Sequence, residues 1–426
     1  MTTSHPTISS NHRAILSRKL DNLKAQGNYR HFLDIRKSAQ LFPRFFYETR
    51  DGGTRSAVNW CSNDYLGMST DAEIIGYMTD TTFESGTGSG GTRNISGTTV
   101  HHKALEQTVA TLHHKQAGLI FNSAYLANLT AISTLGRAFE HCVFISDEEN
   151  HASIIEGIRL SRCEKHIFRH NDVKHLEEIL ESLGRDTVKI VVFESVYSIS
   201  GTVAPIKAIS QMAKKYDALT YIDEVHAVGL YGEHGEGMVA QQHCEHLIDV
   251  VNGTFAKAFG VIGGYVAADA IIIDYIRSFG EGFIFTTSLP PSVCKAAIES
   301  IEKVKSNRSL RNSMHQKVKS LRNALRKYHI PFDDNESHIT RIPIGDSLAC
   351  KNIADRLLLE HGVYLQPVNP PTVKKGGECL RITVSAKHDE NQILHLAKAL
   401  AAELHRKDDL VNERGSSSFL FFDPIY

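Results

Sequence analysis

The sequence predicts an α/β protein with a large domain built on a mostly parallel central sheet and a smaller C-terminal α/β domain. From about residue 101 to 300, short apolar runs typical of buried strands alternate with segments whose apolar residues recur at helical spacing. A long helical segment at 291–328 then leads into the smaller domain. With 426 residues, the chain is long enough to bury a large core.

Helical spacing of apolar residues predicts helices over residues 11–41, 71–85, 101–116, 126–137 and 172–183. A short strand is expected at 58–61. Six further strands are expected at 118–122, 142–146, 190–194, 219–223, 247–253 and 264–267. These elements divide the chain into an N-terminal helical segment (1–57), a large α/β domain (58–300), a small α/β domain (301–407) and a C-terminal extension (408–426).

The C-terminal extension begins with polar residues and then carries an apolar cluster that includes Phe419, Phe421 and Phe422. Two interpretations stay open: a disordered tail, or a segment that docks onto the body of the protein or onto a partner subunit. A truncation after Lys407 that left stability, assembly and kinetics unchanged would exclude docking.

Composition excludes several classes of function. The net charge of −1 gives no reason to expect nucleic acid or a membrane surface as a partner, and no apolar run approaches the roughly 20 residues that span a bilayer. The seven scattered cysteines, without a Cys-x-x-Cys pair, favour a reducing cytoplasm over a disulfide framework. The cluster His243, Cys244, Glu245 and His246 has no second ligand cluster, so no metal site is expected.

Lys257 is the most informative residue. It follows an apolar run, and small residues on both sides of it leave room for a bulky group to approach the backbone. An ammonium group at the end of a buried strand is costly unless it is paired, solvated or neutralised. A Schiff-base lysine of a pyridoxal phosphate (PLP) enzyme is one solution. A lysine that reaches the surface is the alternative.

Asp223 and His226 stand 34 and 31 residues before Lys257, where another expected strand opens into a Gly-rich loop. A PLP ring needs a carboxylate on its pyridinium nitrogen, which Asp223 could supply. It also needs a donor to its phenolic oxygen, a role that suits His226. Taken singly, Asp223 could be a turn residue and His226 a core histidine, but the conjunction with Lys257 is much rarer.

Further residues after expected strands could complete such a site. Ser123, Ala124 and Tyr125 open a helix whose free N–H groups favour a phosphate, and Thr254 could add a hydroxyl. His151 could stack on a pyridine ring, although a surface histidine is the alternative. Ser198 is a candidate donor to the phenolic oxygen.

Two other patterns bear on the ligand. Gly86, Gly88 and Gly91 match the spacing of a dinucleotide-binding loop, but a helix rather than a strand is expected before them, so this interpretation is rejected. A flexible loop that approaches a ligand explains them better. Arg381, in a strand-like run, is suited to bidentate binding of a carboxylate, with a surface ion pair as the alternative.

These residues lie in motifs that resemble the 5-aminolevulinate synthases, of the α-oxoamine synthase family within the fold type I PLP-dependent enzymes (aspartate aminotransferase-like fold). The resemblance covers residues 12–407. It rests on CSNDYLGM at 61–68, GGTRNISGT at 90–98, NHAS at 150–153, DEVH at 223–226 and GTFAK at 253–257. The run TRNISGT is the discriminating one, because sister enzymes acting on other acyl-CoAs carry different residues in that loop.

The resemblance implies condensation of glycine with succinyl-CoA, with release of CoA and carbon dioxide, in a homodimer whose active sites are shared between subunits. Lys257 would hold PLP and then remove a glycine α-proton; Asp223, His151, His226 and Ser198 would contact the ring, and Thr254 the phosphate. Thr286 and Thr287 of the neighbouring subunit would assist Thr254. The implied substrate-binding residues are Arg381 and Asn63 for the substrate carboxylate, and Arg30, Thr92, Asn94, Ile95, Ser146, Lys165 and Thr372 for succinyl-CoA.

One position departs from the family pattern. Where the family loop usually reads Asn-Tyr-Pro-Thr-Val, this chain has Asn369, Pro370, Pro371, Thr372 and Val373. The additional proline stiffens the loop and removes an aromatic ring and an N–H. Two alternatives stay open: a sister synthase acting on another acyl-CoA or amino acid, and a catalytically silent scaffold. The intact set around Lys257 argues against the scaffold.

Overall fold

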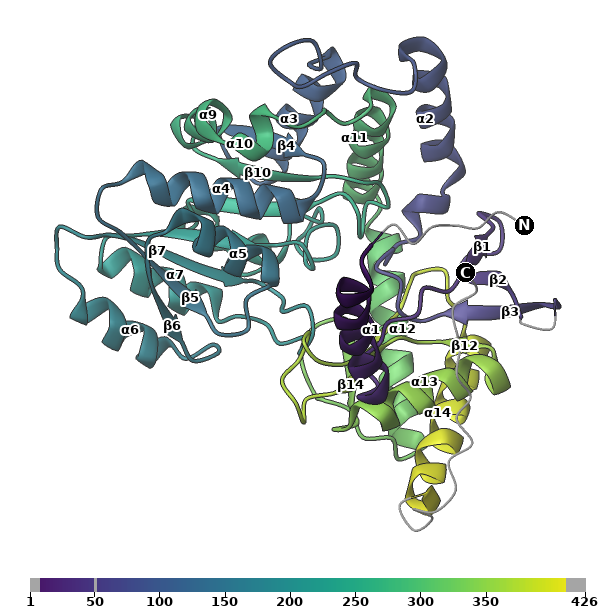
Figure 1. The fold of residues 1–426 in the computed structure, drawn as a ribbon. Coiled ribbons are helices and arrows are strands. Elements are labelled where there is room, and N and C mark those ends of the chain that lie inside the picture. Colours follow the sequence, from purple (N-terminus) through teal and green to yellow (C-terminus); the bar gives the residue numbers. More distant parts are fainter. Residues whose placement is uncertain (1–7, 50–51, 411–426) are drawn as a thin grey trace.

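The computed structural model describes residues 8–49 and 52–410. Its largest sheet lies in the large domain (Figure 1) and has the strand order β4-β10-β9-β8-β7-β5-β6. Strands β5 to β9 run parallel to one another, whereas β10 is antiparallel to both β4 and β9. The strands are β4 (Ala117–Phe121), β5 (Cys142–Asp147), β6 (Glu164–Phe168), β7 (Val188–Glu194), β8 (Ala218–Asp223), β9 (Val250–Thr254) and β10 (Gly264–Ala268). The predicted mostly parallel sheet is confirmed.

Helices cover both faces of this sheet, because its strands are apolar on both sides. In β7, Val191 and Phe193 pack in a core with helices α3 (Val100–Leu112), α6 (Val173–Ser182) and α7 (Ile206–Lys215). Ile190 and Val192 point the opposite way, into a second core with α4 (Ala124–Ala138), α5 (Ala152–Ser161) and α9 (Ala270–Phe279). A near-continuous run of β-branched residues is therefore the signature of a strand buried on both faces.

The smaller domain contains two further sheets, seen at the lower right of Figure 1. One has the order β1-β2-β3-β12, so that N-terminal strands join a C-terminal one through the parallel β3–β12 pair. The other has the order β11-β14-β13. The strands are β1 (Ile35–Lys37), β2 (Arg44–Glu48), β3 (Thr54–Asn59), β11 (Ile339–Pro343), β12 (Val363–Tyr364), β13 (Pro367–Val368) and β14 (Cys379–Thr383).

The remaining helices link or cover these sheets. They are α1 (Ser10–Ala25), α2 (Ala72–Ser85), α8 (Met238–Gln241), α10 (Glu281–Ile284), α11 (Pro291–Ser306), α12 (Arg308–Lys327), α13 (Ser347–His361) and α14 (Glu390–Leu410), with 3-10 turns η1 (Met68–Thr70) and η2 (Glu245–Leu247). Within the described residues, none of these helices is long and apolar enough to cross a membrane. Helix α2 confirms that no strand precedes Gly86.

The extent of several predicted elements was wrong; the strand predicted at 58–61 is β3 at Thr54–Asn59, and the helix predicted over 101–116 ends at Leu112. The helix predicted over 11–41 ends at Ala25, because Gly27 takes a positive φ of 71° and the chain then forms β1. The strand predicted from 247 begins at Val250, after the turn η2. The segment 291–328 is two helices, broken at Asn307, whose side chain accepts a hydrogen bond from Leu310 N at 3.0 Å and caps α12.

Two expectations keep their status as predictions. The division of the chain at residues 57, 300 and 407 stays a prediction. The apolar cluster at 419–422 lies outside the described residues.

Candidate active site

The predicted site residues lie along one edge of the large sheet, as the register of its strands requires. Thr254 at the end of β9 pairs with Gly264, and Asp223 at the end of β8 pairs with Asn252. On the other side, Asp223 pairs with Glu194 at the end of β7. The carboxyl ends of parallel strands are the usual place for a ligand in such sheets. The fold therefore brings these side chains together at one edge of the large sheet.

Lys257 and His226 meet at this edge. Lys257 Nζ lies 2.8 Å from His226 Nε2, and the Nδ1 atom of the same ring lies 2.8 Å from the Tyr65 hydroxyl. Burial and the positive charges of Lys257 and Arg381 hold the pKa of His226 well below its ordinary value. The ring is therefore neutral and serves as a hydrogen-bonding link between the lysine and Tyr65.

Burial also changes the lysine itself. It lowers the pKa of Lys257 from its usual value to about 7; the charge of Asp223 opposes this shift and that of Arg381 adds to it. A lysine with such a pKa carries a substantial fraction of neutral, nucleophilic amine at neutral pH.

The lowered pKa predicts the reactivity of Lys257 in the cofactor-free protein. Labelling by an amine-specific acylating reagent should rise with a midpoint near pH 7, whereas Lys215, whose pKa is raised by its contact with Glu177, should label only at much higher pH. Peptide mass spectrometry across a pH series measures both sites in one sample. Equal midpoints for the two lysines would contradict the assignment.

Arg381 approaches the same group from β14 of the smaller domain. Its Nη1 donates to Asn63 Oδ1 at 3.2 Å, its Nη2 to the Tyr65 hydroxyl at 3.4 Å, and its Nε to the backbone oxygen of Ser198 at 2.6 Å. The guanidinium group is therefore fixed from three sides while staying partly accessible. For Ser198, this contact is made by the backbone oxygen rather than by the hydroxyl predicted to act as a donor.

Asp223 is buried and held as an acceptor. Its Oδ2 accepts hydrogen bonds from Asn128 Nδ2 at 2.7 Å and Asn252 Nδ2 at 3.1 Å, and its Oδ1 accepts one from Val225 N at 2.8 Å. Both oxygens are therefore occupied by donors. On the neighbouring strand, burial and the charge of Asp223 raise the pKa of Glu194 well above its ordinary value, which favours a neutral Glu194 next to Asp223.

His151 begins helix α5. Its Nδ1 accepts a hydrogen bond from Ser153 N at 3.2 Å and lies 2.8 Å from the Ser153 hydroxyl. The residue keeps part of its surface open to solvent, although the surrounding protein atoms desolvate the ring, and Tyr125 meets the ring edge-on at a centroid distance of 6.1 Å. Its backbone placement thus presents a flat, accessible aromatic face next to the strand edge.

A helix N-terminus completes this side of the site. Ser123 caps α4 by accepting a hydrogen bond from Leu126 N at 3.1 Å, which leaves the N–H groups of Ala124 and Tyr125 without intrahelical acceptors. The Thr254 hydroxyl accepts from Ala256 N at 3.1 Å and donates to Gly263 O at 3.0 Å. Gly264 is required here, because a Cβ atom would lie 2.2 Å from Ala124 N.

Thr286 and Thr287 lie beside this helix start within a single chain. Asn122 Nδ2 donates to Thr286 Oγ1 at 3.3 Å and to Thr287 O at 2.8 Å. Thr287 also pairs with Thr92, which brings the loop at 86–99 onto this segment. The contribution of the two threonines to a neighbouring subunit's site stays a prediction.

The residues assigned to succinyl-CoA fall into three groups. Arg30 Nη2 donates to Thr372 Oγ1 at 3.0 Å, and Thr92 Oγ1 donates to Asn94 Oδ1 at 2.7 Å. Four of the predicted residues are therefore in contact with one another, as two pairs. The remaining residues differ in exposure: Ile95 is 80% exposed, Lys165 is exposed on β6, and Ser146 is buried.

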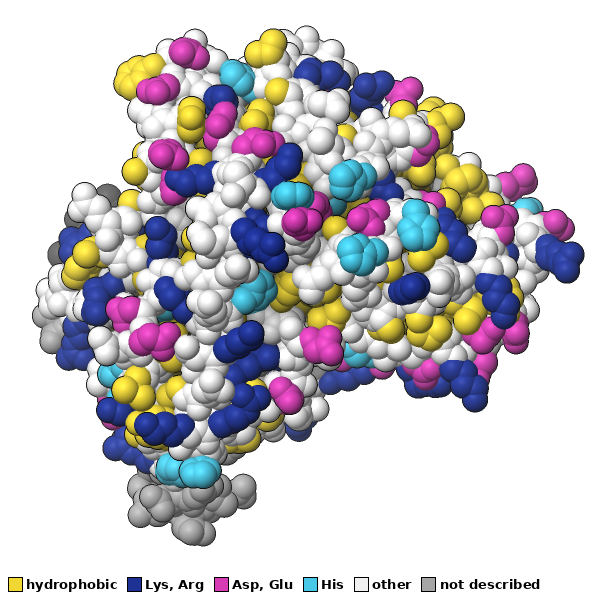
Figure 2. Space-filling model, turned by 180° about the vertical axis from the view of Figure 1, so that it is seen from behind, with side chains coloured by type: hydrophobic (Ala, Val, Ile, Leu, Met, Phe, Trp, Pro, Cys, Tyr) yellow, Lys and Arg dark blue, Asp and Glu magenta, His cyan; other side chains and the backbone are white. Residues whose placement is uncertain are grey.

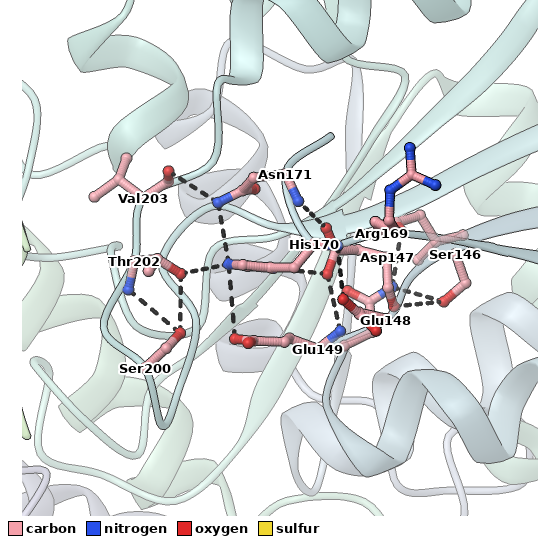
Figure 3. Close-up of polar contacts among 12 residues, drawn as sticks. Ser146, Asp147, Glu148, Glu149, Arg169, His170, Asn171, Ser200, Thr202 and Val203 are labelled. Atoms are coloured by element: carbon pink, nitrogen blue, oxygen red, sulfur yellow. Dashed lines mark hydrogen bonds and ion pairs between the residues drawn. The ribbon is translucent and has the colours of Figure 1, made fainter. Parts of the chain in front are cut away.

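Ser146 belongs to a polar network at the ends of β5 and β6 (Figure 3). His170 Nδ1 lies 2.9 Å from Asp147 Oδ1, and its Nε2 lies 2.7 Å from Thr202 Oγ1. Burial lowers the pKa of His170, but the hydrogen bond to Asp147 and the charges of Asp147, Glu149 and Glu148 together outweigh it, so the net shift of the pKa is upward. Ser146 itself accepts from Asn150 Nδ2 at 2.8 Å. This network fixes the loop after β7, which carries Ser198.

Sequence reasoning missed Tyr65, Asn128 and Asn252 as contributors to the site. Tyr65 stands inside the motif at 61–68, and Asn252 only five residues before Lys257, so proximity to those motifs was a usable signal. Asn128 is a buried polar residue on the apolar face of α4, next to the buried Ala127 and Ala131. A polar residue on such a face needs partners, and this was the only signal that the sequence offered for it.

Comparison with known proteins places the chain in a family. The family model described as aminotransferase class I and II matches residues 55–400. The 5-aminolevulinate synthase of Bradyrhizobium diazoefficiens is 47% identical over 387 residues, which cover 89% of this chain and 93% of that protein. The 5-aminolevulinate synthase of Paracoccus denitrificans is 46% identical over 389 residues, which cover 91% and 95%.

The solved structures agree on the fold. A serine palmitoyltransferase from S. paucimobilis, solved with PLP bound, superposes with a TM-score of 0.85 at 28% sequence identity and covers 94% of this chain and 99% of its own. The strand-edge site, the matching model and the relatives lead to one assignment. The chain belongs to the aminotransferase class I and II family and, within it, to the 5-aminolevulinate synthases.

Proposed function

We propose that this enzyme condenses glycine with succinyl-CoA to give 5-aminolevulinate, CoA and carbon dioxide. The reaction forms a bond between the glycine α-carbon and the succinyl carbonyl carbon, and breaks the thioester bond and the bond to the glycine carboxyl group. One observation carries the proposal: Lys257, 2.8 Å from His226, lies at the strand edge that also presents Asp223. Membership of the 5-aminolevulinate synthases supports it.

The donor set at this edge fits PLP. Lys257 supplies an amine, Asp223 a carboxylate held by three donors, His151 an open ring face, and the start of α4 two free N–H groups. When bound, PLP supplies an aldehyde for the lysine and a protonated ring that draws electrons from the substrate. Asp223 would keep the ring nitrogen protonated, His226 would contact the phenolic oxygen, and Ser123, Ala124, Tyr125 and Thr254 would surround the phosphate.

Arg381 is the proposed partner of the glycine carboxylate. Its guanidinium group is held by Asn63, Tyr65 and Ser198, so little side-chain entropy is lost when a carboxylate binds. A fixed carboxylate orients the glycine α-carbon relative to Lys257. The amine of Lys257 then removes the α-proton, and its pKa of about 7 matches a base that works near neutral pH.

The contact between Arg30 and Thr372 is the proposed closure over the acyl-CoA. It joins the segment after α1 to the loop at 369–377, and Asn369 Nδ2 adds contacts to Gly27 O at 3.2 Å and Ser347 O at 3.0 Å. Both segments would have to move together to admit and release a CoA-sized molecule. When the Arg30–Thr372 contact opens, Arg30 would become available for the succinyl carboxylate, and Thr92 and Asn94 are proposed to contact the same substrate.

Pro370 provides a test of this closure. Because proline stiffens the loop, Pro370→Tyr should change kcat by several-fold, and the ratio of kcat/KM values for succinyl-CoA and a shorter acyl-CoA should stay constant. Steady-state kinetics with both thioesters measure the two quantities. Pro343→Tyr, in β11 outside this loop, is the matched control. An unchanged kcat would show that the motion of the loop does not limit turnover.

A homodimer is proposed for the functional state. Several large apolar side chains around the loop at 86–99 are exposed, among them Phe83 at 88%, Ile95 at 80% and Phe285 at 78%. Patches of this kind mark interaction surfaces. On the face drawn in Figure 2, exposed hydrophobic side chains lie among charges of both signs. A reducing cytoplasm is proposed as the location, since no disulfide joins the cysteines in the described part of the chain.

Light scattering after size exclusion tests the dimer. A mass of twice 47.3 kDa is expected, and Phe285→Asp should shift it towards 47.3 kDa. The exposed Phe32 lies in another part of the chain, so Phe32→Asp is the control that should leave the mass unchanged. A wild-type mass of 47.3 kDa at micromolar concentration would overturn the proposal of a dimer.

A panel of acyl-CoAs with glycine tests the reaction. The highest kcat/KM is expected with succinyl-CoA, and mass spectrometry of the product should identify 5-aminolevulinate. Better turnover with a longer or shorter acyl chain would instead identify a sister synthase. A protein that gains no absorbance near ~420 nm with PLP and no spectral response to glycine would be a silent scaffold.

A further inference from the structure

Asn128 is hydrogen-bonded to Asp223 and to Ser153, and Ser153 in turn contacts His151 at the proposed cofactor site. Asn128 lies on α4, is 1% exposed, and its Nδ2 atom donates to Asp223 Oδ2 at 2.7 Å and to Ser153 Oγ at 3.0 Å. Its Oδ1 accepts a hydrogen bond from the Tyr221 hydroxyl at 2.8 Å. Tyr221 and Ser153 are each 1% exposed, so the network is closed to solvent.

The direction of every hydrogen bond in this network follows from Asp223. An acceptor-only carboxylate must face the amide nitrogen of Asn128, which turns the amide oxygen towards Tyr221. Burial raises the pKa of Tyr221 well above its ordinary value, so this phenol keeps its proton and donates it. The two amide hydrogens of Asn128 are then both used, one on Asp223 and one on Ser153.

The hydroxyl proton of Ser153 determines which ring nitrogen of His151 carries a proton. Because Ser153 Oγ accepts from Asn128, the Ser153 hydroxyl hydrogen is free to donate to His151 Nδ1, 2.8 Å away. The Ser153 backbone N–H points at the same nitrogen from 3.2 Å. With two donors aimed at it, Nδ1 carries no proton, so a neutral His151 holds its proton on Nε2.

We propose that Asn128 is a positioning residue that sets, through one amide group, both the orientation of the Asp223 carboxylate and the tautomer of His151. The inference rests on the proposed function, in which these two side chains face PLP. The charged and titratable groups around His151 are Asp223, Lys257, His226, Tyr125 and Glu194. Burial lowers the pKa of His151, Asp223 raises it and Lys257 lowers it, with a net downward shift that agrees with a neutral ring.

The network has two arms: the hydrogen bond from Asn128 to Asp223, and the path from Asn128 through Ser153 to His151. Three variants separate them. Asn128→Leu removes both arms and keeps the number and branching of the side-chain heavy atoms. Ser153→Ala removes only the hydroxyl donor to His151. Asn252→Ala is the matched control, because Asn252 also donates to Asp223 Oδ2, at 3.1 Å, but makes no hydrogen bond with Ser153 or His151 within the described part of the chain. Thermal unfolding of each apoprotein checks that the variant is folded.

Two readouts are measured: the dissociation constant of PLP from the apoprotein, and the pH profile of kcat/KM for glycine. We expect PLP to bind at least tenfold more weakly to Asn128→Leu, a few-fold more weakly to Asn252→Ala, and within twofold of wild type to Ser153→Ala. His151 becomes easier to protonate when the Ser153 hydroxyl is removed, or when the loss of Asn128 leaves that hydroxyl free to turn away from Nδ1. The acid limb should therefore move to higher pH in Asn128→Leu and Ser153→Ala, and stay in place in Asn252→Ala.

The inference is overturned if Ser153→Ala has the same acid limb as wild type, or if Asn128→Leu binds PLP as tightly as Asn252→Ala does. Should Asn128→Leu fail to fold, Ser153→Ala alone still decides the arm to His151. A wild-type protein that binds no PLP would refute the proposed function itself. Normal PLP binding and turnover in the wild type, with unaltered variants, would refute only the role of Asn128.

Discussion

Replacing Lys257 by alanine should leave a protein that binds PLP weakly but forms 5-aminolevulinate at least about 10⁴-fold more slowly. General-base catalysis alone contributes typically about 10²- to 10⁴-fold, and Lys257 is proposed to act both as the anchor of the cofactor and as the base. Its surroundings suit both roles, since burial lowers its pKa to about 7 and His226 lies 2.8 Å away. Product formation under saturating glycine and succinyl-CoA measures the loss.

The control for this variant is Lys214→Ala, which removes a lysine of α7 that pairs with Asp249. It should retain activity within a few-fold. Adding a small primary amine to Lys257→Ala should restore part of the turnover, because a free amine can replace a base but not an anchor. If Lys257→Ala keeps more than a tenth of wild-type activity, neither proposed role of Lys257 is correct.

Replacing Asp223 by asparagine should have the second largest effect. Removing one partner of a buried charge pair costs about 3–5 kcal/mol, which corresponds to about 10²- to 10⁴-fold in rate at roughly 1.4 kcal/mol per factor of ten. The asparagine amide would also confront the donors of Asn128 and Asn252, which now point at Oδ2. We expect weaker PLP binding and a loss of turnover in this range.

Asp249→Asn is the matched control, because Asp249 lies near the opposite end of the same pair of strands. Its carboxylate accepts from Thr220 N at 2.7 Å and pairs with Lys214. It should affect stability but leave kcat within a few-fold of wild type. Turnover in Asp223→Asn that matched this control would exclude Asp223 as the partner of the cofactor ring.

The sequence was most informative where chemistry and periodicity coincide. The strand that ends in Asp223 and the strand that leads to Lys257 are predicted from their apolar runs. In the structure β8 ends at residue 223, as predicted, and β9 ends at Thr254, one residue after the predicted 253. Parallel pairing then places the two side chains at the same sheet edge without any further information. The position of the site was therefore predictable.

The partners of those residues were much less predictable. Asn128 and Tyr65 reach the site from α4 and from the loop after β3, and only the folded chain determines that they meet there. The extent of the first helix was also missed, because one glycine with a positive φ ends it while the composition of 26–41 stays compatible with a helix. Side-chain hydrogen bonds between distant segments leave little trace in periodicity.

Borohydride reduction of the PLP-loaded protein, followed by peptide mapping, tests the central claim most directly. Reduction fixes the pyridoxyl group to the amine that holds it, and mass spectrometry locates the modified residue. The geometry at the end of β9 predicts a single modified peptide carrying the label on Lys257. A label on another lysine, or a protein that retains no label after reduction, would contradict it.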